Sequence, residues 1–278
     1  MKRGVKIRLK KVAEYVLNKF ALRLAYKAYE KWLWRQIEKG PMPYHVAIIP
    51  DGNRRWAREM GLTVFNGHEA GYRKVKELLK WLWELGIKVV TIYAMSYENC
   101  LYRGPEEKEH LFKLINNGLK EFMESEDPVK YGVRVKVFGR LDLVPDYLKE
   151  TIKKVEEGTC NNNERFLNVA LCYGGRQEII DGIKKLINDV KKGALDIDSI
   201  DEELFSDKYL YTSWLPKELK NPDLVIRTSG EIRVSNFLLW QSAYSEFYFC
   251  EVYWPEFRKI DLWRAIRSYQ HRERRFGR

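Results

Sequence analysis

HVAIIPDGNRRWAREMGLTVFNGH, residues 45–68, is the stretch that decides the fold. Its apolar run from Val46 to Ile49 shows no polar alternation, which is typical of a strand buried on both faces of a sheet. Pro50 ends the run, and Asp51-Gly52-Asn53 predicts a turn that also caps a helix beginning at Arg54. A carboxylate and basic residues therefore stand where a strand passes into a helix, which is where open α/β sheets bind ligands.

The chemistry of this turn favours an anionic ligand. Helix N-termini attract anions through unpaired N–H groups and the helix dipole, and two arginines, Arg54 and Arg55, add positive charge. Asp51 offers a carboxylate to a hard cation such as Mg²⁺. The stretch therefore predicts a cradle for a diphosphate, although a strand, a turn and a solvated basic helix explain it equally well at this stage.

The composition fits a globular protein with a full hydrophobic core and anionic partners. The chain has 278 residues and a formal net charge of +11. Nucleic acid, a membrane surface and a phosphorylated substrate all qualify as partners of so basic a protein. Its cysteines, which lack CxxC spacing and lie in or near apolar runs, are expected to be reduced core residues rather than zinc ligands or disulfides. They are Cys100, Cys160, Cys172 and Cys250. No signal peptide is visible, which predicts a cytoplasmic location.

Residues 5–39 predict one long basic helix, with an apolar stripe among many lysines and arginines. The stripe consists of Val12, Val16, Phe20, Leu24 and Trp32. Charges interrupt it too often for a membrane span. Such a helix can lie on an anionic bilayer or pack on its own domain. We therefore predict an N-terminal helix and linker over residues 1–43 and a core domain over residues 44–278.

Six strand-like runs alternate with helical patterns along the rest of the chain, which predicts an α/β fold with a central, mostly parallel six-stranded sheet flanked by helices. The expected strands are 46–49, 89–95, 133–138, 166–171, 223–227 and 247–254, the third nearer an edge because its polar and apolar residues alternate. The principal helices are expected at 75–85, 106–123, 144–156, 177–192, 200–211, 237–244 and 259–272.

A second polar loop, RTSGEIRVSN (227–236), also follows a buried strand. Arg227 and Arg233 offer forked cationic donors and Ser235 a hydroxyl, a combination suited to phosphate oxygens. Two such loops at strand ends suggest two phosphate-bearing ligands side by side. An open slot between the helices 75–85 and 111–119 and the sheet would form a hydrophobic tunnel for a long hydrocarbon.

Several segments together resemble the cis-prenyltransferases, the family of undecaprenyl and dehydrodolichyl diphosphate synthases. They are HVAIIPDGNRRWA, GHEAGYRKV, YAMSYENCLYRGPEE, ALCYGGRQEI, DLVIRTSGEIRVSNFLLWQSAYSEFYFCEVYWPEF and the terminal RERRFG. The leading basic helix and GPMPYHVAIIPDGNRRWAR look most like the archaeal branch, whose members use geranylgeranyl diphosphate as starter. The resemblance covers residues 45–277 in the family's order.

The resemblance implies Mg²⁺-dependent, repeated cis-condensation of isopentenyl diphosphate onto an allylic diphosphate, either geranylgeranyl or farnesyl diphosphate. The long-chain polyprenyl diphosphate so formed is the precursor of a glycosyl carrier lipid. The enzyme would be a homodimer in the cytoplasm, with peripheral contact to a membrane as one option. The residues that take the proton lost in each condensation stay open: Asp51, His68, Asn99 through water, and a phosphate oxygen all qualify.

The resemblance also assigns roles to individual residues. The catalytic residues would be Asp51 and Asn99, and the metal ligands Asp51 and Glu246. The allylic diphosphate would be held by Gly52, Asn53, Arg54, Arg55, Trp56, His68, Ser96 and Arg103. Isopentenyl diphosphate would be held by Arg227, Arg233, Ser235, Arg275 and Gly277, the last two reaching a partner subunit's site. Glu107 would belong to the loop that closes over substrate.

Three positions depart from the bacterial pattern, and two other functions compete with catalysis. Val64 replaces an arginine, Cys100 replaces a tryptophan, and Arg103 is displaced by one residue. One rival is a catalytically silent partner subunit, although such subunits lack the DGN aspartate and much of the RTSGE loop, both present here. The other rival is a basic nucleic-acid-binding protein. We expect no nucleic-acid binding, because the basic residues are spread along the chain and the aromatic residues lie mostly in predicted strands.

Overall fold

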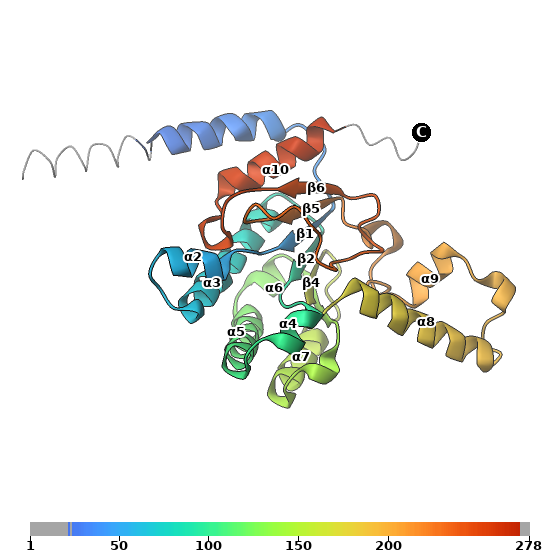
Figure 1. The fold of residues 1–278 in the computed structure, drawn as a ribbon. Helices are drawn as coiled ribbons and strands as arrows, with labels where there is room; N and C mark the ends of the chain where they lie inside the picture. The colour runs from blue at the N-terminus through green and yellow to red at the C-terminus, as the bar shows by residue number, and fades with distance from the viewer. Residues whose placement is uncertain (1–21, 23, 273–278) are drawn as a thin grey trace, which may run out of the picture. The chain divides into compact units, whose positions relative to one another are not determined.

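The computed structural model describes Leu22 and residues 24–272, and its centre is a six-stranded parallel sheet (Figure 1). The strand order is β3-β4-β2-β1-β5-β6, and every neighbouring pair is parallel. The predicted α/β class and six strands are confirmed, as is the edge position of the third strand. Because β1 pairs with both β2 and β5, the polar loops after these strands meet at the carboxyl ends of the central strands.

The strands are short and almost fully buried, as continuous apolar runs predict. Their bounds are β1 His45–Ile49, β2 Val89–Tyr93, β3 Val133–Phe138, β4 Arg165–Ala170, β5 Leu224–Arg227 and β6 Glu246–Phe249. Neighbouring side chains alternate between the two faces of the sheet. Ile92 and Val169 line a cavity beneath two helices, whereas Tyr93 and Ala170 pack into a buried cluster with Phe237 on the other face.

Helices connect these strands and cover both faces. The main helices are α2 Asn53–Glu59, α3 Val64–Glu84, α4 Tyr97–Tyr102, α5 Pro105–Glu124, α6 Asp127–Lys130, α7 Asp146–Gly158, α8 Gly175–Lys191, α9 Glu202–Lys208 and α10 Lys259–His271. Thr63 and Asn66 form a capping box that fixes the start of α3. Gly104-Pro105 starts α5, since proline is well accommodated in the first helical turn. The N-terminal turns of α3 and α5, which these residues fix, lie beside the first polar loop.

Two local predictions were wrong. Residues 237–244 form turns rather than a helix, and Leu238 adopts a φ of 43° that no helix contains. The sixth strand ends at Phe249, because the chain then folds back so that the carbonyl of Cys250 accepts a hydrogen bond from the N–H of Gly230. The turn at residues 51–53 does start a helix as predicted: Gly52 occupies the N-cap position of α2 without a side-chain hydrogen bond, and the helix begins at Asn53, one residue before the expected Arg54.

The cysteine prediction was also wrong. Cys100 and Cys172 form a disulfide across 72 residues of sequence, and Cys160 is exposed. The pairing arises because α4 lies beside the residues that follow β4, where Ser96 and Tyr173 form an isolated β-bridge. Sequence spacing carries no trace of this contact, because the two segments meet only in the folded sheet.

The described residues divide into two compact units, residues 42–257 and a smaller unit that joins the described part of the N-terminal segment to α10. Within the smaller unit, residues 24–37 are helical, and Trp34 lies 5.5 Å from Trp263 between ring centroids. Leu33 and Ile37 are buried, whereas the predicted stripe members Leu24 and Trp32 are about half exposed. Val12, Val16 and Phe20 lie outside the described residues. The division at residue 43 stays a prediction.

No helix in the described part of the chain is both long and apolar enough to span a membrane.

Candidate active site

The first polar loop turns sharply at Gly52, immediately after β1. Gly52 adopts a φ of 105°, and a Cβ there would lie 2.7 Å from the Tyr253 ring and 2.9 Å from the Ser229 Cβ. Only glycine combines this backbone conformation with such a close approach. The turn brings Asp51 to the end of the sheet and starts α2 at Asn53.

Asp51 accepts hydrogen bonds from both loops. Its Oδ2 lies 2.8 Å from Nη2 of Arg227, and its Oδ1 accepts from the Gly52 N–H at 2.7 Å. Arg55 lies 3.5 Å from the same carboxylate. Burial raises the pKa of Asp51, but the hydrogen bond and charge of Arg227 outweigh it, so the pKa lies below its ordinary value. Asp51 is therefore ionised at neutral pH and can act as a metal ligand or hydrogen-bond acceptor.

Arg227 fastens the second loop to the first. It is only 4% exposed, and its Nη1 donates to Ser235 Oγ at 2.7 Å and to the Arg233 carbonyl. The loop is irregular, since Ser229, Ser235 and Asn236 all have positive φ. The Nε of Arg227 is buried without a partner among the described residues. The Arg227 guanidinium therefore orders both loops, and its Nε–H remains available to donate a hydrogen bond to a ligand.

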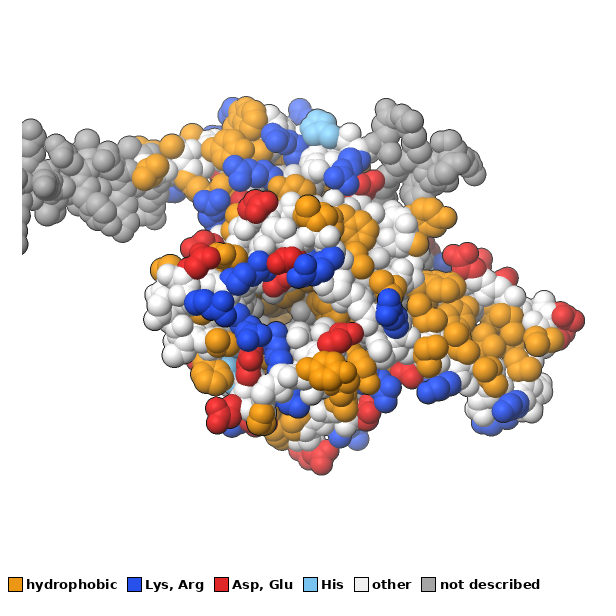
Figure 2. Space-filling model, in the orientation of Figure 1, with side chains coloured by type: hydrophobic (Ala, Val, Ile, Leu, Met, Phe, Trp, Pro, Cys, Tyr) orange, Lys and Arg blue, Asp and Glu red, His pale blue; other side chains and the backbone are white. Residues whose placement is uncertain are grey.

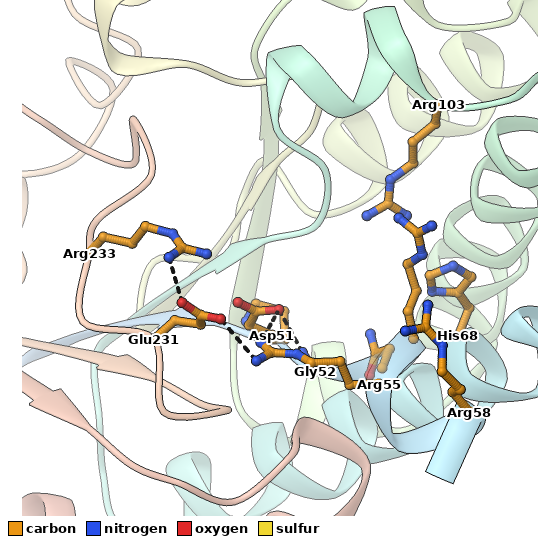
Figure 3. A pocket seen from close by; sticks show the side chains of 11 residues that line it. Asp51, Gly52, Arg55, Arg58, His68, Arg103, Glu231 and Arg233 are labelled. Carbon is orange, nitrogen blue, oxygen red and sulfur yellow. Dashed lines mark hydrogen bonds and ion pairs between the residues drawn. The ribbon is translucent and has the colours of Figure 1, made fainter. Parts of the chain in front are cut away.

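Glu231 links the basic residues of the two loops. Its carboxylate lies 2.9 Å from Nη1 of Arg55 and 2.5 Å from Nη1 of Arg233 (Figure 3). The sequence prediction assigned no role to Glu231, because the motif alone did not show that it faces Arg55 from the first loop. The carboxylates of Asp51 and Glu231 thus both contact the Arg55 guanidinium.

A second cluster gathers on the opposite side, where α3 and α5 begin. His68 donates from Nε2 to Glu107 at 2.9 Å, and Arg103 donates to the same oxygen at 2.8 Å. Arg54 lies 3.8 Å from it. Burial lowers the pKa of His68, although Glu107 opposes this, so His68 is neutral at neutral pH. Burial raises the pKa of Glu107, but the hydrogen bond from His68 and the charge of Arg103 outweigh it, so the pKa lies below its ordinary value. Glu107 is therefore a carboxylate that holds His68, Arg103 and Arg54 in place.

These two clusters border a charged pocket of about 460 Å³, visible as the hollow ringed by basic and acidic side chains in Figure 2. Arg58, which the sequence prediction missed, joins it because it follows Arg54 by one helical turn. The residues lining the pocket are Pro50, Asp51, Gly52, Asn53, Arg54, Arg55, Arg58, His68, Arg103, Glu231 and Arg233. So many arginines around an open pocket suit a ligand with several negative charges.

A separate apolar cavity of about 330 Å³ begins at the same place. Pro50, Asn53 and His68 line both, and the cavity continues between α3, α5 and the sheet. Its apolar wall includes Val75, Leu79, Ile92, Ala94, Leu111, Leu114, Ile115, Leu119, Phe122, Leu167 and Val169. A slot beneath these two helices was predicted as a hydrocarbon tunnel, and the structure contains a cavity there.

The remaining predicted site residues fall into three groups. Ser96 and Asn99 line a third cavity of about 540 Å³, together with Asp51 and Arg227. Trp56 lines none of the three cavities; its indole N–H donates to Glu256 at 3.2 Å. Arg275 and Gly277 lie outside the described residues.

Glu246 lies at the far end of the sheet from Asp51. It is in register with Leu224, which is in register with Val46, whereas Asp51 lies two residues beyond Ile49, the last residue of β1. A strand rises about 3.3 Å per residue, so the two carboxylates of one chain are separated by most of the strand length. The structure therefore does not bring the two predicted metal ligands together within one chain.

The donor set around Asp51 fits Mg²⁺. This ion usually binds one or two carboxylates and completes its shell with water and substrate phosphates. The described residues contain no group of three or more histidine, cysteine or acidic side chains that could hold a metal. Asp51, with Glu231 beside it, matches a site of this kind, completed by a diphosphate.

A charged pocket at the carboxyl ends of parallel strands, which shares three lining residues with an apolar cavity, suits a diphosphate attached to a hydrocarbon. Residues 49–277 match the family model described as putative undecaprenyl diphosphate synthase. The chain therefore belongs to this prenyltransferase family, as the sequence motifs predicted.

Curated relatives match almost end to end. A tritrans,polycis-undecaprenyl-diphosphate synthase (GGDP specific) from Sulfolobus acidocaldarius is 52% identical over 96% of this chain and 100% of its own length. A geranylgeranyl-diphosphate-specific synthase of the same name from Methanopyrus kandleri is 51% identical over the full length of both chains. The assignment as a prenyltransferase enzyme is thus confirmed, and neither the silent-subunit nor the nucleic-acid-binding alternative is favoured.

Solved structures agree. Lavandulyl diphosphate synthase from Lavandula x intermedia, in complex with dimethylallyl diphosphate, is 36% identical with a TM-score of 0.81, covering 85% of this chain and 99% of that one. A probable undecaprenyl diphosphate synthase from Campylobacter jejuni is 30% identical with a TM-score of 0.68, covering 86% and 100%.

Proposed function

We propose that this chain condenses isopentenyl diphosphate repeatedly onto geranylgeranyl diphosphate, with farnesyl diphosphate as a poorer starter, and makes a long polyprenyl diphosphate with cis double bonds. Such a product is the precursor of a glycosyl carrier lipid. The observation that carries the proposal is that Pro50, Asn53 and His68 line both the charged pocket and the apolar cavity, so the two lie side by side. The names of the archaeal relatives support the choice of starter.

The two loops take different substrates in this proposal. Asn53, Arg54 and Arg55, with the Gly52 turn, hold the allylic diphosphate, and its hydrocarbon enters the cavity past His68. Arg227, Arg233 and Ser235 hold isopentenyl diphosphate. Glu107 keeps Arg103 and His68 in position until the allylic diphosphate, a stronger acceptor for arginine, replaces it.

Each cycle breaks the allylic C–O bond, forms a C–C bond to the double bond of isopentenyl diphosphate and releases one proton and inorganic diphosphate. The arginines stabilise the negative charge that develops on the leaving diphosphate, in a pocket where their positions are already fixed. Mg²⁺, held by Asp51 with Glu231 nearby, would add Lewis-acid stabilisation of the same charge. The proton lost in each cycle can go to the neutral His68, to a water held by Asn99 in its cavity, to Asp51 or to a phosphate oxygen.

The proposal includes a homodimer. Isoleucines are exposed along α8, and Figure 2 shows apolar side chains gathered over the region where Figure 1 places this helix. Ile180 is 51% and Ile187 45% exposed. A partner subunit would cover them and would supply Arg275 and Gly277. Replacing Ile183 by Glu should yield monomers in light scattering; an unchanged dimer would place the interface elsewhere.

Peripheral membrane contact through the N-terminal helix is also proposed. Leu24 and Trp32 are exposed on a helix whose Lys27, Lys31 and Arg35 are exposed as well, a combination suited to an anionic bilayer surface. Trp32→Ala combined with Leu24→Ala should reduce co-sedimentation with anionic liposomes. Unchanged co-sedimentation would argue against this contact.

The experiment that tests the reaction follows incorporation of labelled isopentenyl diphosphate with Mg²⁺ and resolves products by length. Geranylgeranyl diphosphate should give a ladder ending in long products, and farnesyl diphosphate should give the same ladder less efficiently. A preference for farnesyl diphosphate would reverse the starter assignment. No incorporation by folded protein with either starter would contradict the catalytic proposal.

A further inference from the structure

The short helix α4 carries substrate-facing residues but is too short to hold its own conformation. It spans six residues, Tyr97–Tyr102, whereas isolated helices become stable only beyond about 12 residues. Asn99 lies within it and Arg103 follows directly, and both line the cavity that reaches Asp51 and Arg227. Contacts with the rest of the protein must therefore fix where these two side chains lie.

Hydrogen bonds fix the first turn of α4. The Ser96 hydroxyl accepts from the Asn99 N–H at 3.1 Å and caps the helix. The Tyr97 N–H donates to the Tyr173 carbonyl at 2.7 Å, and the Tyr173 N–H donates to the Met95 carbonyl at 3.1 Å. These bonds tie the entry of α4 to the segment that follows β4.

The Cys100–Cys172 disulfide fixes the second half of the helix. The two Cα atoms are 5.5 Å apart and both side chains are buried, Cys100 at 5% and Cys172 at 0% exposure. Cys172 belongs to the rigid part of the fold, since its carbonyl accepts from the Arg140 N–H at 3.2 Å after β3. By contrast, Leu101 is 39% and Tyr102 81% exposed just beyond the bond.

We propose that the Cys100–Cys172 bond is a positioning crosslink for the substrate loop. It holds Asn99 at the edge of the sheet before substrate binds and confines any movement of the loop to residues 101–104. Arg103 can then leave Glu107 for an allylic diphosphate while Asn99 stays in place. The inference rests on the proposed assignment of Arg103 to the allylic diphosphate.

The bond forms by thiol–disulfide exchange with a low-molecular-weight disulfide. The thiols of Cys100 and Cys172 are oxidised to the bridge, and the small disulfide is reduced to two thiols, so atoms and electrons balance. An excess of a small dithiol reverses the reaction and is itself oxidised to a cyclic disulfide. The oxidised and reduced states of the unmutated chain can therefore be compared directly.

The test measures steady-state kinetics on wild-type enzyme in oxidised, reduced and re-oxidised states, with thiol content confirmed by alkylation and mass spectrometry. Reduction should raise KM for the allylic diphosphate on the order of tenfold, since small misplacements of positioning groups cost this much or more. KM for isopentenyl diphosphate should stay within about twofold, because Asn236 joins the second loop to α4 at Glu98, in the first turn that Ser96 and Tyr173 hold without the bridge. Re-oxidation should restore the starting values.

Two variants sharpen the comparison. Cys100→Ala should behave as the reduced wild type and should not respond to dithiol. Cys160→Ser, which changes an exposed cysteine outside the bridge, should keep wild-type kinetics and the wild-type response. If Cys100→Ala does not fold, the reduced wild type still decides the question without any substitution.

Hydrogen exchange supplies a readout that does not depend on turnover. Amides of residues 99–101 should exchange faster after reduction, whereas those of α3 should not change. Free thiols in protein treated with glutathione disulfide, or unchanged allylic KM and unchanged exchange after confirmed reduction, would overturn the proposal. Oxidised enzyme that shows protected α4 amides but no incorporation would instead contradict the proposed reaction and leave the crosslink standing.

Discussion

The charged pocket and the apolar cavity begin at the same three residues and are built in opposite ways. The loops after β1 and β5 and the short helix α2, which follows the Gly52 turn, form most of the pocket, with His68 and Arg103 opposite them. Two long helices, α3 and α5, form the cavity wall together with residues of β2 and β4. Turns and one short helix gather polar groups from several segments, whereas long helices and strands offer continuous apolar surface.

The two regions also differ in how they are stabilised without substrate. Arg55, Asp51 and Glu231 neutralise one another at a partly exposed surface, where such ion pairs contribute little net stability. They can therefore exchange partners for a diphosphate at small cost. The cavity wall is stabilised by burial of apolar side chains, so its shape, rather than its charge, limits what it holds.

The largest expected effect is on the charged side. Asp51→Ala should lower kcat on the order of 10³-fold, because the site loses its carboxylate for Mg²⁺ and leaves Arg227 with an unpaired charge. Incorporation of labelled isopentenyl diphosphate measures the loss. The matched control Asp146→Ala, a carboxylate with 93% of its side chain exposed, should keep wild-type activity. Near-normal turnover by folded Asp51→Ala would remove the metal role.

A smaller effect separates the two loops. Arg227→Ala should raise KM for isopentenyl diphosphate by roughly 10- to 100-fold, the equivalent of one or two charge-assisted hydrogen bonds. KM for the allylic diphosphate should rise less, because Arg54 and Arg55 remain and only the ion pair between Arg227 and Asp51 is lost on that side. Lys113→Ala, an exposed cation on α5, serves as the control. A change confined to the allylic substrate would reverse the assignment of the loops.

The cavity should respond in product length rather than in rate. Val75→Phe adds volume to the cavity wall on α3 and should shorten the longest product, with the first condensation slowed by less than about threefold, since that step needs only the cavity mouth. Glu77→Phe places the same ring on a side chain that is 53% exposed in the same helix and should leave the product ladder unchanged. An unchanged ladder from Val75→Phe would mean that the hydrocarbon runs elsewhere.

The smallest effect concerns the opposite end of β1, away from the charged pocket. His45 is fully buried, and burial lowers its pKa to about 4. Between about 4 and its ordinary value of 6.5, the unfolded chain binds more protons than the folded one, so stability falls as pH decreases. Denaturant unfolding should show a loss of about 1 kcal/mol from pH 7 to 5.5. His45→Gln should remove most of this slope; an unaltered slope would assign it to other groups.

The sequence predicted the regular parts of the molecule better than the irregular ones. Continuous apolar runs placed the strands, and the loops after Ile49 and Arg227 were correctly expected at neighbouring strand ends. The turns at 237–244 were missed because their hydrophobic side chains pack into the core without helical backbone. Long-range pairings could not be predicted either, because spacing in the sequence does not show them. Glu231 contacts Arg55, and Cys100 bonds to Cys172, only once the sheet has brought their segments together.

The measurement that tests the central claim most directly is a crystal structure with Mg²⁺ and geranylgeranyl thiodiphosphate, a starter whose leaving group departs slowly. The diphosphate should contact Arg54, Arg55 and Arg103, and the hydrocarbon should pass His68 into the cavity between α3 and α5. A diphosphate held by Arg227 and Arg233, or a hydrocarbon lying outside that cavity, would contradict the division between a charged pocket and an apolar cavity.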